Sequence, residues 1–271
     1  MTKKSKLIIT MTFLAFAILL SCSNSSVEAK TLKYKSYKNA CKSGKYIYYT
    51  TYDELIRVNV HNYKKKLIYK EKSGACFNQD IAIKGDYIYF SLNSNGGTLF
   101  NDPYIYRIKK NGKKLKKLAH GDTPKVIGKK VYYEEVKQNK YESSHYDTTG
   151  RIFSVTLTGK KKRLEKNITF KELYHGWSGT ELTEKTKVGK VKYYADSTGK
   201  AIIKNKNGEE KVIFAAKDGW ALHEYIILGD YMIVKNYVED YVIDGRCYNI
   251  DIYLLNIKTG KYKKIGKMYV S

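Results

Sequence analysis

Residues 85–118 read GDYIYFSLNSNGGTLFNDPYIYRIKKNGKKLKKL, and the rest of the chain looks like weaker copies of this stretch. After the Gly-Asp turn, Tyr87–Phe90 is a run of β-branched and aromatic residues, and Tyr104–Ile108 is a second run. A polar segment rich in Asn and Gly separates the two. Runs of this composition between turn residues predict β-strands, so the stretch begins as a strand pair.

The same stretch continues into a hairpin. Asn111-Gly112 favours a tight turn in which both residues have positive φ, so residues 113–118 are expected to return as a further strand. Residues 81–83, Ile-Ala-Ile, supply another short strand ahead of the first turn. The unit therefore predicts four antiparallel strands.

The opening turn and strand of this unit occur in five copies along the chain. The copies are GKYIYY at 44–49, GDYIYF at 85–90, GKKVYY at 128–133, GKVKYY at 189–194 and GDYMIV at 229–234. They follow one another about every 40 residues, except for a gap of about 60 between the third and fourth copies. Such a period, made of four short strands, is typical of a propeller blade. We therefore expect an all-β chain that forms a β-propeller of about five four-stranded blades.

The irregular gap leaves the blade number open. Residues 165–186 are extra and are expected to form either a long innermost strand with a loop or a degenerate sixth blade. Residues 179–199 can also be read as an inserted hairpin. A β-sandwich would share the alternating strands, but its strands would not repeat one motif in the same order. A helical repeat would need a period of about 3.6 residues, which the sequence lacks after Leu20.

The start of the chain has the order of a secretory signal. Lys3, Lys4 and Lys6 precede an uncharged, mostly apolar run from Leu7 to Leu20, and small polar residues follow. That run is too short to span a membrane comfortably, since about 20 residues are needed. We expect residues 1–29 to be a signal peptide and residues 30–271 to be a single propeller domain that is extracellular.

Two processing sites compete at the end of this segment. Residues 18–22, ILLSC, resemble a bacterial lipobox, in which Cys22 would be lipidated and would anchor the protein to the outer face of the cytoplasmic membrane. Alternatively, Val27-Glu28-Ala29 has small residues at the two positions that signal peptidase reads, which would release a soluble secreted protein. Both alternatives stay open, and a retained signal anchor is a third.

The chain is strongly basic. Its formal net charge is +25, and lysines occur in every copy instead of in one block. Such a charge can attract an anionic surface such as a wall polymer, an acidic polysaccharide or lipid headgroups. A plainer explanation is an AT-rich genome, which enriches Lys, Asn, Ile and Tyr together, and lysine also protects exposed sheet edges. No nucleic-acid-binding motif occurs, so nucleic acid is not expected as a partner.

The sequence contains no motif typical of a catalytic or metal site. It has no Gly-x-Ser-x-Gly elbow and no Cys or His spacing typical of zinc. The histidines are isolated from one another, at His61, His120, His145, His175 and His223. Cys41 and Cys76 precede the turns of consecutive copies, so a disulfide between them and two free buried thiols are both open. We expect no metal and no cofactor.

The repeated pattern Gly-Asp-x-Ile-Tyr-Phe, followed by Ile-Tyr-Arg-Ile-x-x-x-Gly-x-x-x-x-x-Leu, resembles a known propeller family. It is the uncharacterised family of Gram-positive, clostridium-type bacteria related to the low-density-lipoprotein-receptor propeller, with TolB as a more distant relative. The resemblance covers about residues 33 to 271. It implies an extracellular or lipid-anchored propeller of unknown function and supplies no catalytic residues. The weak fourth copy departs from the pattern.

The loops that join the second and third strands of the blades are expected to share one face. They are long at 91–103, 134–150 and 236–249. Variation of loop length on one face is where repeat proteins usually place binding. Aromatic rings beside carboxylates suit sugar or peptide ligands. The candidate ligand-binding residues are Asn101, Asp102, Tyr141, His145, Tyr146, Asp147, Asp240, Tyr241, Asp244 and Arg246.

These observations favour a non-enzymatic, monomeric propeller that binds through this face. The expected partner is a protein, a peptide or an anionic or neutral polysaccharide of the cell envelope, with membrane contact only through a lipid at Cys22. One alternative is a polysaccharide- or peptide-cleaving enzyme, because two catalytic carboxylates can meet in space without a sequence pattern. A second alternative is a structural or adhesive cell-surface lipoprotein.

Overall fold

A computed structural model describes residues 29–34, 39–95, 100–138, 146–172, 182–186, 189–193, 200–204, 207–215, 222–238 and 248–270. The described part is all-β, and its strands form five four-stranded antiparallel sheets and one two-stranded parallel sheet. None of these described residues belongs to a helix that could cross a membrane. Residues 1–28 of the predicted signal segment, Cys22 included, lie outside the described residues.

The strands follow the chain in order within every four-stranded sheet. Sheet 1 consists of β2 (Ala40–Ser43), β3 (Tyr46–Thr50), β4 (Glu54–Asn59) and β5 (Lys65–Lys70). Sheet 2 consists of β6 (Cys76–Lys84), β7 (Tyr87–Asn95), β8 (Phe100–Lys109) and β9 (Lys116–His120). Sheet 3 consists of β10 (Asp122–Ile127), β11 (Lys130–Gln138), β12 (Tyr146–Thr156) and β13 (Arg163–Glu165).

The last two copies form sheets of the same kind. Sheet 4 consists of β15 (Leu182–Thr186), β16 (Gly189–Tyr193), β17 (Lys200–Lys204) and β18 (Glu210–Ala215). Sheet 5 consists of β19 (Leu222–Ile227), β20 (Tyr231–Val238), β21 (Tyr248–Asn256) and β22 (Tyr262–Val270). The two remaining strands, β1 (Lys30–Tyr34) and β14 (Ile168–Glu172), pair in parallel.

Both faces of the central strands are buried, which explains the apolar runs of the sequence. In β3, Ile47 and Tyr49 pack toward sheet 5, whereas Tyr48 packs toward sheet 2. Successive side chains of a strand point to opposite faces, so a strand buried on both sides needs apolar residues at every position. The repeated Tyr-Ile-Tyr-Tyr type of run therefore marks a sheet that lies between two neighbours.

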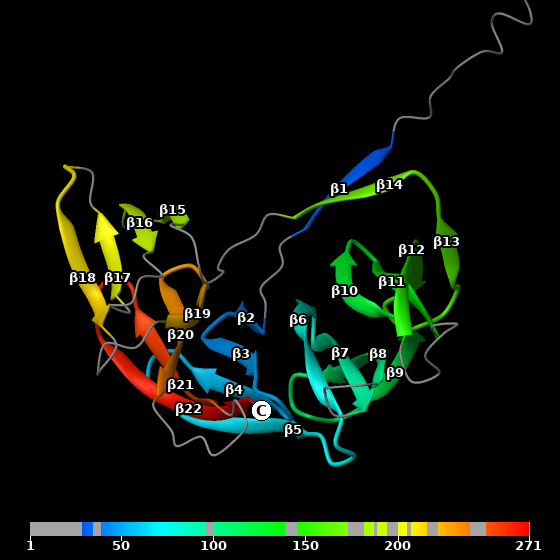
Figure 1. The fold of residues 1–271 in the computed structure, drawn as a ribbon, viewed down its shortest axis with the longest axis horizontal. Helices are drawn as coiled ribbons and strands as arrows, with labels where there is room; N and C mark the ends of the chain where they lie inside the picture. Colours follow the sequence, from blue (N-terminus) through cyan, green and yellow to red (C-terminus); the bar gives the residue numbers. More distant parts are fainter. Residues whose placement is uncertain are drawn as a thin grey trace, which may run out of the picture.

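Apolar clusters join the sheets in the spatial order 3, 2, 1, 5, 4. Figure 1 shows β2–β5 between β6–β9 on one side and β19–β22 on the other. The first and last sheets of the chain thus lie side by side, as happens when repeated sheets curl around an axis. The prediction of an all-β propeller of five four-stranded blades is confirmed, and the described residues contain no sixth four-stranded sheet.

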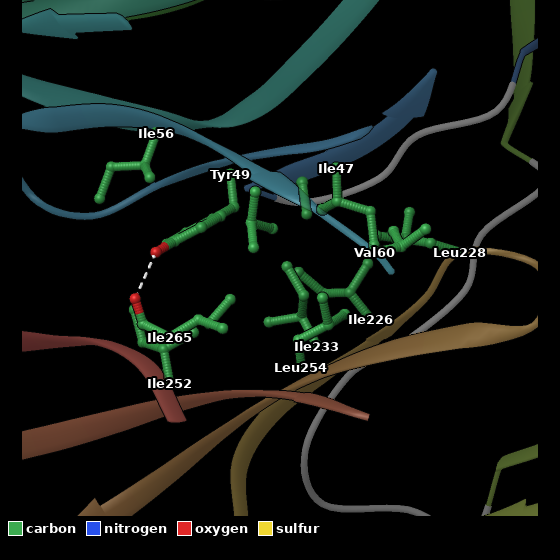
Figure 2. Packing of buried hydrophobic residues seen from close by; sticks show 12 residues of the cluster. Ile47, Tyr49, Ile56, Val60, Ile226, Leu228, Ile233, Ile252, Leu254 and Ile265 are labelled. Carbon is green, nitrogen blue, oxygen red and sulfur yellow. Dashed lines mark hydrogen bonds between the residues drawn. The ribbon is translucent and has the colours of Figure 1, made fainter. Parts of the chain in front are cut away.

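The interface between sheets 1 and 5 is almost wholly apolar. Figure 2 shows Ile47 and Tyr49 of sheet 1 facing Ile233, Ile252 and Leu254 of sheet 5. All five side chains are fully buried. Burying an aliphatic or aromatic side chain of this size stabilises the folded state by about 1.5–3 kcal/mol, so this cluster is a major source of stability.

A single polar contact joins these two sheets within the cluster. The Tyr49 hydroxyl donates a hydrogen bond to the Ile265 carbonyl at 2.9 Å. Ile265 is the extra residue of a β-bulge, because the pairing of β21 with β22 shifts between Ile252 and Tyr253. A bulged residue is left out of the ladder, and the tyrosine hydroxyl supplies a donor for its carbonyl.

The two ends of the sheets form two distinct faces. The turn between first and second strands is hydrogen-bonded to the turn between third and fourth strands: Val60 donates to Lys45, Lys110 to Asp86 and Ile257 to Asp230, at 2.8–3.0 Å. Both kinds of turn therefore lie at the same end of a sheet. We call this end the turn face.

The opposite end carries the connections between second and third strands and the links between sheets. In sheet 1 the Glu71 amide donates to the Asp53 carbonyl, and in sheet 2 the Gly121 amide donates to the Pro103 carbonyl. We call this end the hairpin face. The described residues of the long loops expected there are strand, because the pairs β7–β8, β11–β12 and β20–β21 extend into them.

One local expectation was wrong, and one open alternative is decided. In the turn after β8, positive φ occurs at Gly112 and Lys114 but not at Asn111, because β8 ends at Lys109 and the connection to β9 is longer than two residues. The described residues of the stretch 165–186, which are 165–172 and 182–186, form no sixth four-stranded sheet. They contain β14, which pairs with β1, and β15, which is the first strand of sheet 4.

The disulfide considered between Cys41 and Cys76 is not formed, and both are free buried thiols. Cys41 pairs with Tyr48 in β2–β3, whereas Cys76 begins the longer strand β6 and pairs with Asn93. The two cysteines are thus not at equivalent positions of their sheets. The Cys41 thiol instead donates to the Ile81 carbonyl, and burial together with the charge of Asp80 raises its pKa to about 12, which makes the thiol unreactive.

Candidate functional site

Five polar and aromatic side chains gather on the hairpin face where sheet 2 meets sheet 3. They are Asp102 and Tyr104 of β8, Lys117 and His120 of β9, and Tyr146 of β12, and we call them the His120 cluster. Asp102 and Tyr104 are two positions apart on one strand, so they share a face of sheet 2. His120 lies directly opposite Tyr104 in the pairing of β8 with β9.

The imidazole of His120 is the centre of the cluster. Its Nε2 lies 2.6 Å from Oδ1 of Asp102, a hydrogen bond that fixes the orientation of the ring. Tyr104 stacks on the imidazole with the ring centroids 4.6 Å apart, and Tyr146 meets it edge to face at 5.5 Å. The His120 side chain keeps 37% of its surface exposed, so the oriented ring can still contact a ligand.

Charge is distributed around the Tyr104 ring. The Nζ atom of Lys117 lies 3.4 Å from the ring centroid, a cation–π contact. Burial, the negative charge of Asp102 and a hydrogen bond to that carboxylate raise the pKa of the Tyr104 hydroxyl. The phenol therefore stays protonated, and the cluster offers a cation, an anion, an imidazole and two phenols within a small area.

The link between β9 and β10 holds His120 in place. A Cβ atom on Gly121 would lie 2.5 Å from both the Glu134 carbonyl oxygen and the Tyr133 ring, so only glycine fits this crossing between sheets. The next residue, Asp122, accepts hydrogen bonds on Oδ1 from the side chains of Asn78 and Ser91 in sheet 2, at 3.1 and 2.8 Å. The connection is thus tied to both sheets.

The structure unites two of the predicted binding residues. Asp102 and Tyr146 come from different copies and both contact His120. Asp147 is exposed beside Tyr146 and pairs with Lys137, and Asn101 lies in β8 next to Asp102. Tyr141, His145, Asp240, Tyr241, Asp244 and Arg246 lie outside the described residues, so their predicted role stays a prediction.

Sequence reasoning missed His120, Tyr104 and Lys117. The histidine was expected to be solvated or part of a core, and the tyrosine was expected to pack between blades. The usable signal was the alternation Asp102-x-Tyr104 at the start of a strand, which places both side chains on one face. His120 comes from the neighbouring strand β9, and its position opposite Tyr104 depends on the register between β8 and β9.

The described residues contain no group of His, Cys, Asp and Glu side chains arranged to hold a metal ion. The chemistry available in the His120 cluster is that of its own side chains: ring stacking and hydrogen bonding to a carboxylate and an imidazole. Such a set suits a polar ligand with hydroxyl or amide groups and a flat apolar side.

No protein family and no curated protein matches the sequence. Similar solved structures include a TolB protein from Agrobacterium tumefaciens, which is 15% identical, with 86% of this chain and 81% of that chain covered and a TM-score of 0.33. Oligogalacturonate lyase in complex with manganese is 11% identical, with 82% of this chain and 62% of that chain covered and a TM-score of 0.35.

The tricorn protease is 13% identical, with 87% of this chain covered and a TM-score of 0.38, but the chain spans only 26% of that protein. These likenesses are distant and concern the propeller type of fold alone. Because enzymes and TolB occur side by side among them, they do not decide between catalysis and binding.

Proposed function

We propose that this chain is an exported, non-enzymatic propeller that binds a polymer or peptide of the cell envelope through its hairpin face. The observation that carries the proposal is the convergence of Asp102, Tyr104 and Tyr146 on His120 from two neighbouring sheets. Export is supported by the order of basic, apolar and small polar residues in positions 1–29. The resemblance to the low-density-lipoprotein-receptor type of propeller also implies export.

The ligand class that we favour is a polysaccharide. A sugar ring offers an apolar side to the exposed part of a tyrosine ring and hydroxyl groups to a carboxylate and an imidazole. In the His120 cluster the Tyr146 ring, the Asp102 carboxylate and the His120 imidazole supply these three kinds of contact.

The test is titration calorimetry with soluble cell-wall glycan fragments, neutral and acidic polysaccharides and short peptides. Tyr146→Ala should weaken binding of the active probe by about tenfold, because an aromatic contact is worth about 1 kcal/mol or more. Tyr262→Ala, an exposed tyrosine of sheet 5 on the turn side, is the matched control and should bind normally. Binding that survives Tyr146→Ala unchanged would place the ligand elsewhere.

A hydrolytic activity is the second candidate, favoured by the Asp102–His120 hydrogen bond. A carboxylate that orients an imidazole is the arrangement by which a histidine becomes a general base. Turnover should then be measurable on the same probes and should fall by at least about a hundredfold in Asp102→Asn, the lower end of the range for one acid–base group. Binding without turnover would reject the enzyme and leave the first proposal intact.

A further inference from the structure

The turn face is rich in lysine. Asp86 and Asp230 lie in turns of the same face, and Asp230 pairs with Lys258 at 3.0 Å. The turns between third and fourth strands of sheets 1, 2, 3 and 5 contain many exposed lysines, whereas in sheet 4 the same turn carries Glu209 and Glu210. In and directly after these turns, the exposed lysines are Lys64, Lys65, Lys66, Lys113, Lys114, Lys116, Lys160, Lys161, Lys162, Lys258, Lys261 and Lys263. The basic turns belong to sheets that follow one another in space, so their charges add.

Contacts between neighbouring sheets show that these turns form a continuous surface. Lys110 Nζ donates to the Ser43 hydroxyl at 2.8 Å, which joins the turn of sheet 2 to that of sheet 1. Lys116 Nζ donates to the Thr158 carbonyl at 2.9 Å, which joins sheet 2 to sheet 3. The lysine-bearing turns are therefore held in fixed relative positions.

Exposed apolar side chains lie among these lysines. The exposed large hydrophobic residues of the described part are Tyr52, Leu67, Leu115, Val212 and Tyr262. Leu115 lies in the connection before β9, Leu67 is the third residue of β5, and Tyr262 is the first residue of β22. Val212 is the third residue of β18, next to the acidic turn of sheet 4. Leu67 follows Lys64–Lys66, and Leu115 lies between Lys114 and Lys116.

We infer that the turn face docks on an anionic phospholipid bilayer. Lysine close to an anionic leaflet attracts it by long-range charge, and apolar side chains beside the lysines can enter the headgroup region. A soluble polyanion would explain the lysines but would leave Leu67, Leu115 and Tyr262 exposed to water. This inference is independent of the proposed ligand, which binds at the opposite ends of the sheets.

A tryptophan reporter tests which face meets the lipid. In the full chain, Leu115→Trp places an indole on the turn face, and Tyr52→Trp places one at an exposed position of the hairpin face. Vesicles of phosphatidylcholine with about a third phosphatidylglycerol, carrying brominated acyl chains, should quench the first reporter and not the second. The native tryptophans and the apolar segment 7–20 are common to both variants, so their contributions to fluorescence and to vesicle binding are the same in both.

Charge is tested in the Leu115→Trp background. Replacing Lys65, Lys66, Lys113 and Lys160 together with Gln should weaken vesicle binding at least about tenfold, since one lysine near an anionic leaflet contributes about fivefold. The control replaces four exposed lysines at the other ends of the sheets, Lys72, Lys137, Lys166 and Lys200, with Gln and should bind normally. Binding should also fall at about 1 M salt, where the Debye length is about 3 Å.

Each of three results would overturn the inference. The first is equal quenching of the two reporters, and the second is equal binding to vesicles of pure phosphatidylcholine. The third is capture by soluble polyglycerol phosphate with no quenching by anionic vesicles, which would identify the partner as a polymer. Loss of binding in both quadruple variants alike would equally reject a role for this face.

Discussion

The interface of sheets 1 and 5 and the interface of sheets 2 and 3 are built alike in their cores, but only the second carries a candidate binding site. In both, a buried tyrosine hydroxyl donates to a backbone carbonyl of the next sheet, Tyr49 to Ile265 and Tyr89 to Leu157. The other fully buried side chains of the first interface are aliphatic. The second continues outward into the His120 cluster.

The difference shows how a repeated sheet can acquire a site without changing its core. Ile105 and Tyr133 fill the buried part of the second interface as Ile47 and Ile233 fill the first. The polar residues are added only where β8 and β12 extend beyond the core toward the hairpin face. The first interface would then serve stability, and the second would serve both stability and binding.

The largest expected effect comes from cavities in the two cores. Ile233→Ala and Ile105→Ala each remove a fully buried side chain, and each should lower the free energy of unfolding by about 2–5 kcal/mol in denaturant titrations. Only Ile105→Ala should also weaken binding of the glycan probe below the unfolding transition, because Ile105 adjoins Tyr104. Equal loss of binding in both variants would argue against separate roles for the two interfaces.

The hydroxyl groups of Tyr49 and Tyr89 should contribute different amounts to the free energy of unfolding. Tyr49→Phe leaves the carbonyl of bulged Ile265 without that donor, and the unfolding free energy should fall by about 1–3 kcal/mol. Tyr89→Phe should cost less than about 1 kcal/mol, because the Leu157 carbonyl also accepts a hydrogen bond from Arg107 at 3.0 Å. Thermal unfolding of the two variants checks this order, and the reverse order would contradict it.

Acid should weaken sheet 3 before it weakens the interface of sheets 1 and 5. Burial alone would raise the pKa of Glu165, but hydrogen bonds from Lys130 and Ser154, both at 2.6 Å, together with the charge of Lys130, lower it below its ordinary value of 4.5. A lowered folded pKa gives stability that is complete above about pH 4.5 and is lost as the pH falls through the folded value.

Hydrogen exchange measures this effect, which should be the smallest. Amides of β12 and β13 should lose protection on acidification below about pH 4.5, whereas those of β3 and β20 should change less. Glu165→Gln should reduce the acid sensitivity of β12 and β13 and leave that of β3 and β20 unchanged. Identical acid profiles for the variant and the original protein would show that another group is responsible.

The fold was predictable from the sequence because its information is local and repeated. Each copy carries its own glycine turn and its own run of β-branched and aromatic residues, so the sheets could be counted before their arrangement was known. The parallel pairing of β1 with β14 has no such signal. Its partners are far apart in the sequence and neither belongs to a copy.

The site was predictable only in part, because the contact between His120 and Tyr104 depends on the register between β8 and β9. A two-residue turn at Asn111-Gly112 would have placed Ala119 opposite Tyr104. The pairing of β8 with β9 instead shifts between Ile105 and Tyr106, so His120 takes that place. A bulge changes every pairing beyond it by one residue, and its position cannot be read from composition.

The contact between Tyr49 and Ile265 has a consequence for how the chain matures. Tyr49 and Ile265 are 216 residues apart, so β3 is synthesised long before sheet 5. Until sheet 5 has been made, the apolar side of β3 stays exposed to the surroundings. Pairings so far apart in sequence form slowly, and open apolar sheet faces attract other chains meanwhile. Truncation near the C-terminus should therefore yield aggregates instead of a smaller ring.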